Sequence, residues 1–350
     1  MLLAAVARLT LQAPPACTAC RVGAAADVDS SSSAGEASTS GSPESNGASP
    51  MLTLDSQTDG SNVPQAPVWE LDFCSRPLLD ERGKKVWELL ICDQAGEWVF
   101  SRYFPNNKIN STELKNALKE ILSQPGVRKP ERILFFRSQM QTIISRALQD
   151  IEVVAKPSRR CFTLINMLNE RLEHVYKRDE RYSESASTMF KLDLSPPEDV
   201  ADALRGEQWA FVQLPLSHLK SEMAPLEANE MFGKGMPTLH KLGLPDTTLV
   251  PGVAVFSRRA RPLAAWTNSL EIACIKADID RACLLLEAGV RERYRYGAWR
   301  RSPEAEQEAN AWEAAKKQTK GLHFLAHQTH AEAEECEGIW LLLDAPMPDV

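Results

Sequence analysis

Polar and apolar residues follow a strand-like pattern in three successive stretches after residue 67. The stretches are 68–78, 84–93 and 96–105. Turn residues separate them at Asp80–Gly83 and at Gln94–Gly96, and such short, Gly-containing connections are typical of hairpins. We therefore predict three consecutive antiparallel strands at the start of the folded region.

Helical periodicity follows these strands. Ser111 is expected to cap a helix over 111–122, whose apolar residues are spaced so that they share one face. Beyond it, short apolar strands alternate with amphipathic helices, at 132–136 (strand), 139–148 (helix), 151–156 (strand) and 162–176 (helix). The order β-β-β-α-β-α-β-α predicts an α/β fold with a mixed sheet. It is the order of the ribonuclease-H-like layout, which we expect for the first domain.

The second part of the chain has a similar alternation. A charged, Pro-containing stretch over 177–207 is a plausible boundary, and 226–250 is expected to be an ordered loop. Strands are predicted at 208–216, 253–257, 270–279, 282–290, 293–299, 322–327 and 338–344, with a helix at 303–319. This order loosely repeats the first one. A second α/β domain is predicted, and similarity to the first domain is one interpretation of it.

The N-terminal region has the composition of a targeting segment. The first 26 residues contain Arg8 and Arg21 but no acid, and the stretch that follows is rich in Ser, Gly and Ala. This indicates an organelle transit peptide and a disordered linker. A secretory signal is the alternative, although Arg8 interrupts its apolar run. We expect a transit peptide and linker over 1–66, one domain over 67–182 and another over 208–350.

Net charge and hydropathy argue against two classes of protein, generic nucleic-acid binders and membrane-spanning proteins. The chain has 350 residues and a formal net charge of −7, which argues against a generic nucleic-acid binder. Residues 1–66 carry much of the acidic excess, so the rest is nearly neutral. No apolar segment approaches the ~20 residues needed to span a membrane. Cys17 and Cys20 are the only closely spaced cysteine pair, and no metal or other cofactor is expected.

The stretch RERYRYGAWRR over 291–301 combines arginines with aromatic residues. In a strand, Arg291, Arg293 and Arg295 would point to one side and the tyrosines to the other. This is either an ordinary strand with a solvated face or a row of guanidinium groups that binds phosphates. In the second case Trp299 would be able to stack on a base.

Other basic clusters follow predicted strands, where loops commonly form binding surfaces. We therefore hypothesise an RNA-binding surface, and removal of Arg159 and Arg160 together is expected to weaken it. The full set of candidates is Arg137, Lys156, Arg159, Arg160, Arg258, Arg259, Arg291, Arg293, Arg295, Trp299 and Arg300.

The ribonuclease-H-like order also raises the question of catalysis. Such nucleases need several carboxylates around two divalent metals. Asp72 or Glu70 could supply one from the first strand, and Glu113 or Glu120 another from the first helix. The third position, after the fourth strand, begins with Arg137 and has no acid. We therefore expect no catalytic residues and no enzymatic activity.

Several stretches together resemble one family: WELDFCSRPLLDERGKKVWELLICD, RILFFRSQM, KPSRRCFTLINMLNERLEHVY, AAWTNSLEIACIKADI, LLLEAGVRERY and GLHFLAHQ with GIWLLLD. They are similar to the Tab-two-like (Atab-two-like) proteins of cyanobacteria, algae and plants, from about Trp69 to Asp344. The resemblance implies a plastid RNA-binding factor that promotes translation of a photosystem reaction-centre mRNA and supports photosystem assembly. It implies an mRNA 5′ leader as ligand and a location in the chloroplast stroma, with peripheral thylakoid association as an option.

Two other functions remain open. The chain could be a protein-interaction scaffold for assembly, with translation or photosystem assembly proteins as partners and RNA bound by one of them. The near-neutral charge favours this, as does Met231–Met236, which could be an exposed docking loop. A divergent metal-dependent nuclease is the third interpretation.

Overall fold

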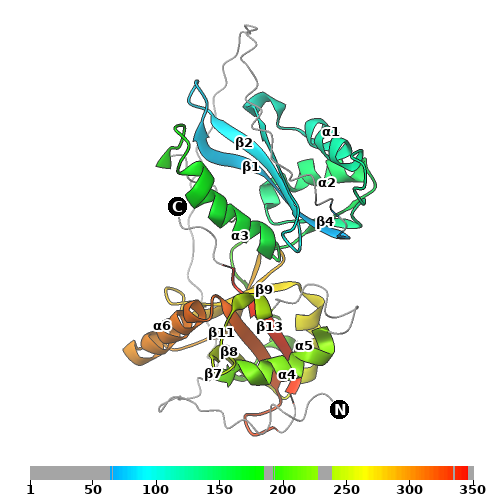
Figure 1. Cartoon of the computed structure of the whole chain (residues 1–350). Coiled ribbons are helices and arrows are strands. Elements are labelled where there is room, and N and C mark those ends of the chain that lie inside the picture. Colours follow the sequence, from blue (N-terminus) through cyan, green and yellow to red (C-terminus); the bar gives the residue numbers. More distant parts are fainter. Residues whose placement is uncertain are drawn as a thin grey trace.

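The computed structural model describes residues 64, 66–184, 192, 194–227, 239–333 and 336–345. Figure 1 shows them as an upper group of elements from the first half of the chain and a lower group from the second half. The predicted transit peptide and nearly all of the predicted linker lie outside the described residues, as does the loop Met231–Met236. The domain boundaries stay a prediction.

The N-terminal half is built on one five-stranded sheet with the order β3-β2-β1-β4-β5. β1 and β2, and β2 and β3, pair antiparallel, whereas β4 is parallel to both β1 and β5. The strands are β1 (Val68–Leu79), β2 (Lys85–Asp93), β3 (Val99–Phe104), β4 (Arg132–Phe135) and β5 (Val154–Pro157). The helices are α1 (Ser111–Leu122), α2 (Gln141–Gln149) and α3 (Phe162–Arg171).

Helices cover both faces of this sheet, which gives three layers (Figure 1). Alternate residues of β2 point to opposite faces, as the pleat of a strand requires. Leu89 and Ile91 pack in the cluster that contains α1 and α2, while Leu90 and Cys92 pack in the cluster that contains α3. The alternating pattern of the sequence therefore corresponds to two separate cores on the two faces of one sheet.

The predicted order of helices and strands is confirmed in this half, and likeness to the ribonuclease-H layout stays a prediction. Two details differ. The α1 cap is Asn110, whose side chain accepts a hydrogen bond from the Glu113 amide, so Ser111 is the first helical residue. The helix expected to run to Tyr176 leaves α-helical geometry at Leu172 and ends in one turn of π-helix, Leu172–Tyr176.

The C-terminal half contains two four-stranded sheets. The second sheet has the order β6-β11-β10-β9 and the third sheet β13-β12-β8-β7. The strands are β6 (Glu198–Asp199), β7 (Gln208–Pro215), β8 (Leu249–Phe256), β9 (Ile272–Asp278), β10 (Cys283–Ala288), β11 (Glu292–Ala298), β12 (Leu322–Gln328) and β13 (Cys336–Leu343). The helices are α4 (Leu216–Glu227), α5 (Ala260–Ser269) and α6 (Pro303–Gln318).

The third sheet separates two cores. On one face it shares a cluster with the second sheet, α5 and α6, in which Trp312 stacks on Phe211 with 5.2 Å between the ring centroids. On the other face Phe324 and Val250 pack with α4 residues such as Leu219. The α/β fold class is thus the one that the sequence predicts.

Three features of this half differ from the sequence predictions. Helices α4 and α5 were not predicted, and α4 and β8 occupy the two ends of the expected loop at 226–250. The two-residue strand β6 was also missed. After α6, β12 pairs with β8 in the third sheet rather than returning beside β9. The strand order of the first half is therefore not repeated. Among the described residues, no helix has the length and apolar character needed to cross a membrane.

Candidate nucleic-acid interface

Arg137 lies at the end of β4, but its side chain is buried in the N-terminal half. Its Nε donates to Asp72 Oδ1 at 2.6 Å, and the side chains are 7% and 1% exposed. The other Asp72 oxygen accepts from Arg76 Nη1 at 2.7 Å. Both carboxylate oxygens are thus occupied by guanidinium groups, and the structure places Arg137 in an internal ion-pair network.

This network continues through Arg76 to Glu88 on β2. Arg76 Nε donates to Glu88 Oε2 at 2.6 Å, and Arg171 and Tyr176 also hydrogen-bond to the Glu88 carboxylate. Burial alone would raise the pKa of Glu88, but Arg76 and Arg171 lower it below its ordinary value. Burial would likewise raise the pKa of Asp72, but the charges of Arg137 and Arg76 lower it below its ordinary value. We name these residues, Asp72, Arg76, Glu88, Arg137 and Arg171, the N-terminal ion network.

The network bears on the nuclease interpretation. Asp72 is the first-strand carboxylate that would hold a metal, yet it is fully engaged by two arginines. Glu70, the alternative, is 2% exposed and accepts a hydrogen bond from the Leu164 amide. Glu120, the helix candidate, forms a surface pair with Arg102. These carboxylates have separate partners, and within the part of the chain that the structure describes no group of three or more His, Cys, Asp or Glu side chains is placed to hold a metal ion.

The second basic cluster, Lys156 to Arg160, lies where the two halves meet. Arg159 Nη1 donates to Glu287 Oε2 of β10 at 2.6 Å, with side chains 10% and 2% exposed. Arg160 donates to the carbonyl oxygen of Ile272 at 3.1 Å. Lys156 pairs with Glu271 at 2.9 Å, and Ser158 donates to the same carboxylate. The loop after β5 therefore binds the second sheet.

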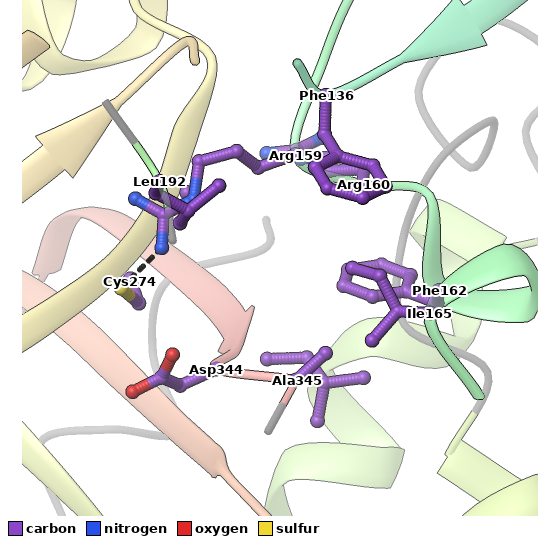
Figure 2. A pocket seen from close by; sticks show the side chains of 11 residues that line it. Phe136, Arg159, Arg160, Phe162, Ile165, Leu192, Cys274, Asp344 and Ala345 are labelled. Carbon is purple, nitrogen blue, oxygen red and sulfur yellow. Dashed lines mark hydrogen bonds between the residues drawn. The ribbon is translucent and has the colours of Figure 1, made fainter. Parts of the chain in front are cut away.

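A small pocket lies at this junction. Figure 2 shows Arg159 reaching toward Cys274 of β9, with Phe162 and Ile165 of α3 on the opposite wall. Its volume of ≈ 20 Å³ is enough for a water molecule but not for a base. The arginines at this position hold the halves together and do not surround a nucleotide-sized space.

Charged groups extend from the junction into the C-terminal half. Lys276 lies 3.6 Å from Glu287 and 3.9 Å from Asp344, which also pairs with the buried Lys316 at 3.2 Å. Burial alone would raise the pKa of Glu287, but Arg159 and Lys276 lower it below its ordinary value. The pKa of Asp344 is lowered against burial by Lys276 and Lys316. We name Arg159, Glu287, Lys276, Asp344 and Lys316 the junction ion chain.

Arg293 and Arg295 lie on β11, and Arg291 directly precedes this strand; Tyr296 is buried and Arg295 is exposed, as the alternation predicts. A neighbouring segment, Ser195–Asp199, runs along its edge. Arg293 donates to the Ser195 carbonyl at 2.7 Å, and Arg295 pairs with Asp199 at 2.9 Å. Arg291 accepts from the Ser195 amide through its carbonyl oxygen and has an exposed side chain. The row is therefore a strand face with partial internal pairing.

The end of the stretch divides into a buried and an exposed residue. Trp299 is 8% exposed and packs edge-on against Trp209, with 6.0 Å between the ring centroids. Arg300 is exposed. The structure places the Trp299 ring in the core of the C-terminal half, while Arg300 faces solvent.

Arg258 and Arg259 follow β8 and are exposed. Arg259 donates to the Ala203 carbonyl at 3.2 Å. Arg258 is 90% exposed, and its Nε lies 3.9 Å from Glu207 Oε2. An open groove of ≈ 460 Å³ lies beside Arg258, lined also by Glu207, Gln208, Phe256, Thr329, His330 and Ala331. The sequence predicted Arg258 as a candidate site residue but not the other residues that line this groove, because they are distant in sequence and are brought together only by strand pairing.

Two histidines of β12 are buried. His323 donates from Nδ1 to the Gly321 carbonyl and accepts from the Ile275 amide at Nε2, while His327 hydrogen-bonds to the Tyr296 hydroxyl. Burial lowers the pKa of His327 to about 3, and burial with the nearby Lys316 lowers that of His323 to about 3. Both histidines are neutral in the folded chain at neutral pH.

These histidines predict a loss of stability in mild acid. Their pKa values rise to about 6.5 on unfolding, so below that pH the unfolded chain binds protons that the folded chain does not. Stability therefore increases with pH across this window, and acidification from pH 7 to 5.5 should lower the free energy of unfolding by about 2 kcal/mol. Urea unfolding at the two pH values measures this. The variant His327→Gln should lose about half as much, and equal losses would contradict the assignment to His327.

The fold and this surface define an α/β protein in which the exposed arginines of the candidate set lie after β8 and in and around β11 of the C-terminal half. Family models match both halves: "RNA-binding protein Tab2/Atab2 N terminal" over residues 68–171 and "RNA-binding protein Tab2/Atab2, C-terminal domain" over residues 187–343. The chain belongs to the Tab2/Atab2 family of RNA-binding proteins, and the resemblance predicted from sequence is confirmed.

Curated relatives agree with this family. The chain is 51% identical over 299 residues to "Protein TAB2 homolog, chloroplastic" of Zea mays, which covers 85% of this chain and 76% of the relative. It is 44% identical over 304 residues to the protein of the same name from Arabidopsis thaliana, which covers 86% and 80%.

Proposed function

We propose that this chain is a chloroplast RNA-binding factor that binds the 5′ leader of a photosystem reaction-centre mRNA and promotes its translation, without catalysing a reaction itself. The observation that carries the proposal is membership of an RNA-binding family across both halves. The relatives are named chloroplastic, and the acid-free N-terminal segment fits import into the same organelle. The stroma is the expected location.

The exposed arginines support RNA as the ligand. Arg258, Arg259, Arg291, Arg295 and Arg300 are exposed on the C-terminal half. The segment from Ser195 to Leu204 lies between the two groups, because Asp199 pairs with Arg295 while the Ala203 carbonyl accepts from Arg259. The buried or junction-bound candidates Arg137, Arg159 and Arg160 are less suited to contact RNA in this conformation.

The pairing of so many cations supports the second candidate function, a scaffold for assembly proteins. Lys156, Arg159 and Arg295 all have carboxylate partners within the chain. A chain that neutralises its own cations offers less charge to a phosphate backbone. In that case a partner protein would supply the affinity for RNA.

Binding of the full chain to a labelled reaction-centre-mRNA 5′ leader, across a salt series and against a scrambled RNA, separates these functions. We expect tighter binding to the leader and an affinity that falls steeply with salt, because each neutralised phosphate releases counterion. Weak binding that is equal for both RNAs would contradict the proposal and favour the scaffold.

A further inference from the structure

The groove beside Arg258 lies at one end of the third sheet. Phe256 ends β8 and pairs with Gln208, the first residue of β7, on one side and with Gln328, the last residue of β12, on the other. β8 and β12 are parallel, so their carboxyl ends meet here. Ligands of α/β sheets commonly bind outside the carboxyl ends of parallel strands, where the loops that follow can surround them.

The size of the groove suits a small ligand. Its volume of ≈ 460 Å³ is within the ~300–1,000 Å³ typical of small-molecule sites and is large enough for one nucleotide. The pocket at the junction, at ≈ 20 Å³, is too small. The groove also differs from the junction pocket because it is open to solvent, and its lining comes from the ends of β8 and β12, the loops that follow them, and the start of β7.

Arg258 is placed to bind an anion in this groove. Among the residues that the structure describes, its nearest carboxylate is Glu207, and the 3.9 Å between Arg258 Nε and Glu207 Oε2 is longer than a hydrogen bond. Arg137 and Arg159, in contrast, donate to carboxylates at 2.6 Å, and their side chains are only 7% and 10% exposed. The Arg258 guanidinium therefore keeps its donors accessible, and a guanidinium fork binds phosphate bidentately.

The remaining lining supplies groups that bind a base. The amide of Gln208 can donate and accept, as recognition of a base edge requires. The exposed imidazole of His330 offers a planar surface for stacking, which histidine provides in single-stranded RNA sites. The carboxylate of Glu207 adds a negative charge to one wall, so a single phosphate suits the groove better than a run of phosphates.

We propose that this groove binds one nucleotide of a single-stranded RNA, with its phosphate on Arg258 and its base beside Gln208 and His330. The site extends the proposed RNA-binding function and rests on it. It also assigns different roles to two neighbouring residues, because Arg258 contributes charge whereas Gln208 contributes selection of the base.

The test measures binding of the full chain to fluorescently labelled 12-mer homopolymers of the four RNA bases at several salt concentrations. Arg258→Ala should bind all of them about tenfold more weakly and reduce the salt slope by about 0.7, the share of one single-strand phosphate. Gln208→Ala should reduce the preference among bases and leave the salt slope unchanged. Arg82→Ala, which removes the same charge from the exposed turn between β1 and β2, should bind within about twofold of the wild type.

Three results would overturn the proposal, in distinguishable ways. If the wild type binds RNA and both groove variants bind equally well, the groove is not the site, while the RNA-binding function stands. If the wild type binds neither these RNAs nor the leader, the RNA-binding function fails and the groove assignment fails with it. If free nucleoside 5′-monophosphates bind the groove but no RNA does, its ligand is a free nucleotide. Thermal unfolding of each variant verifies that it is folded.

Discussion

Replacing Arg76 by alanine should lower the free energy of unfolding by about 3–5 kcal/mol, because it removes one partner of a buried ion network. Arg76 is fully buried and bridges Asp72 and Glu88, which are 1% and 0% exposed. Without the guanidinium, Arg137 remains as the cation beside Asp72, and Glu88 keeps Arg171 together with the hydroxyl groups of Tyr176 and Ser101. A buried carboxylate that has lost one of its cations destabilises the folded state, because its negative charge is less well balanced. Protonation of the carboxylate or partial unfolding would remove this energetic penalty.

Urea unfolding measures this loss, and Arg102→Ala is the matched control. Arg102 also pairs with a carboxylate, Glu120, but the two side chains are 36% and 60% exposed. An exposed pair contributes at most about 1 kcal/mol. If Arg76→Ala were no more destabilising than Arg102→Ala, the N-terminal ion network would not stabilise the fold as we describe.

Replacing Arg159 by alanine should lower the free energy of unfolding by about 3 kcal/mol, since Glu287 would stay buried and lose its closest cation. Lys276, at 3.6 Å, would remain near Glu287 and limit the loss. The pair joins the two halves of the chain, so the variant should also loosen the junction. Small-angle X-ray scattering would then show a larger radius of gyration than for the wild type.

A double-mutant cycle with Glu287→Ala isolates this contact, and we expect a coupling energy of about 1–3 kcal/mol. Lys156→Ala is the control, because its pair with Glu271 is half-exposed and should contribute little. A variant Arg159→Ala that unfolds like the wild type but binds RNA more weakly would contradict the junction role. It would instead support the RNA contact predicted from the sequence.

Local patterns in the sequence were enough to predict most of the secondary structure. The three-strand meander and the helix α1 follow from alternation and from helical spacing, which are properties of neighbouring residues. Helix α5 was missed because its sequence, ARPLAAWTNS, is short and has a proline in its first turn. The pairing of β12 with β8 could not be predicted for a different reason. It joins strands separated by more than 60 residues, and local sequence patterns contain no information on such distant contacts.

The candidate site could be predicted only in part, because a cation's role depends on partners that are distant in sequence. Arg137 and Arg159 occur after strands, as binding residues often do. Their carboxylates, Asp72 and Glu287, lie 65 and 128 residues away. Arg258 follows a strand in the same way, but among the described residues its nearest carboxylate, Glu207, lies 3.9 Å away, beyond hydrogen-bond distance. The sequence pattern is the same in all three cases, and only the tertiary contacts distinguish them.

The short strand β6 has a consequence for self-association. It pairs with β11 through Tyr294 and Arg295, and the Ser195 amide donates to the Arg291 carbonyl just before it. An uncovered strand edge presents free backbone donors and acceptors that another chain can extend into a shared sheet. The segment Ser195–Asp199 occupies this edge from Arg291 to Arg295. A second copy therefore cannot add a strand along this stretch of β11 unless the segment first detaches.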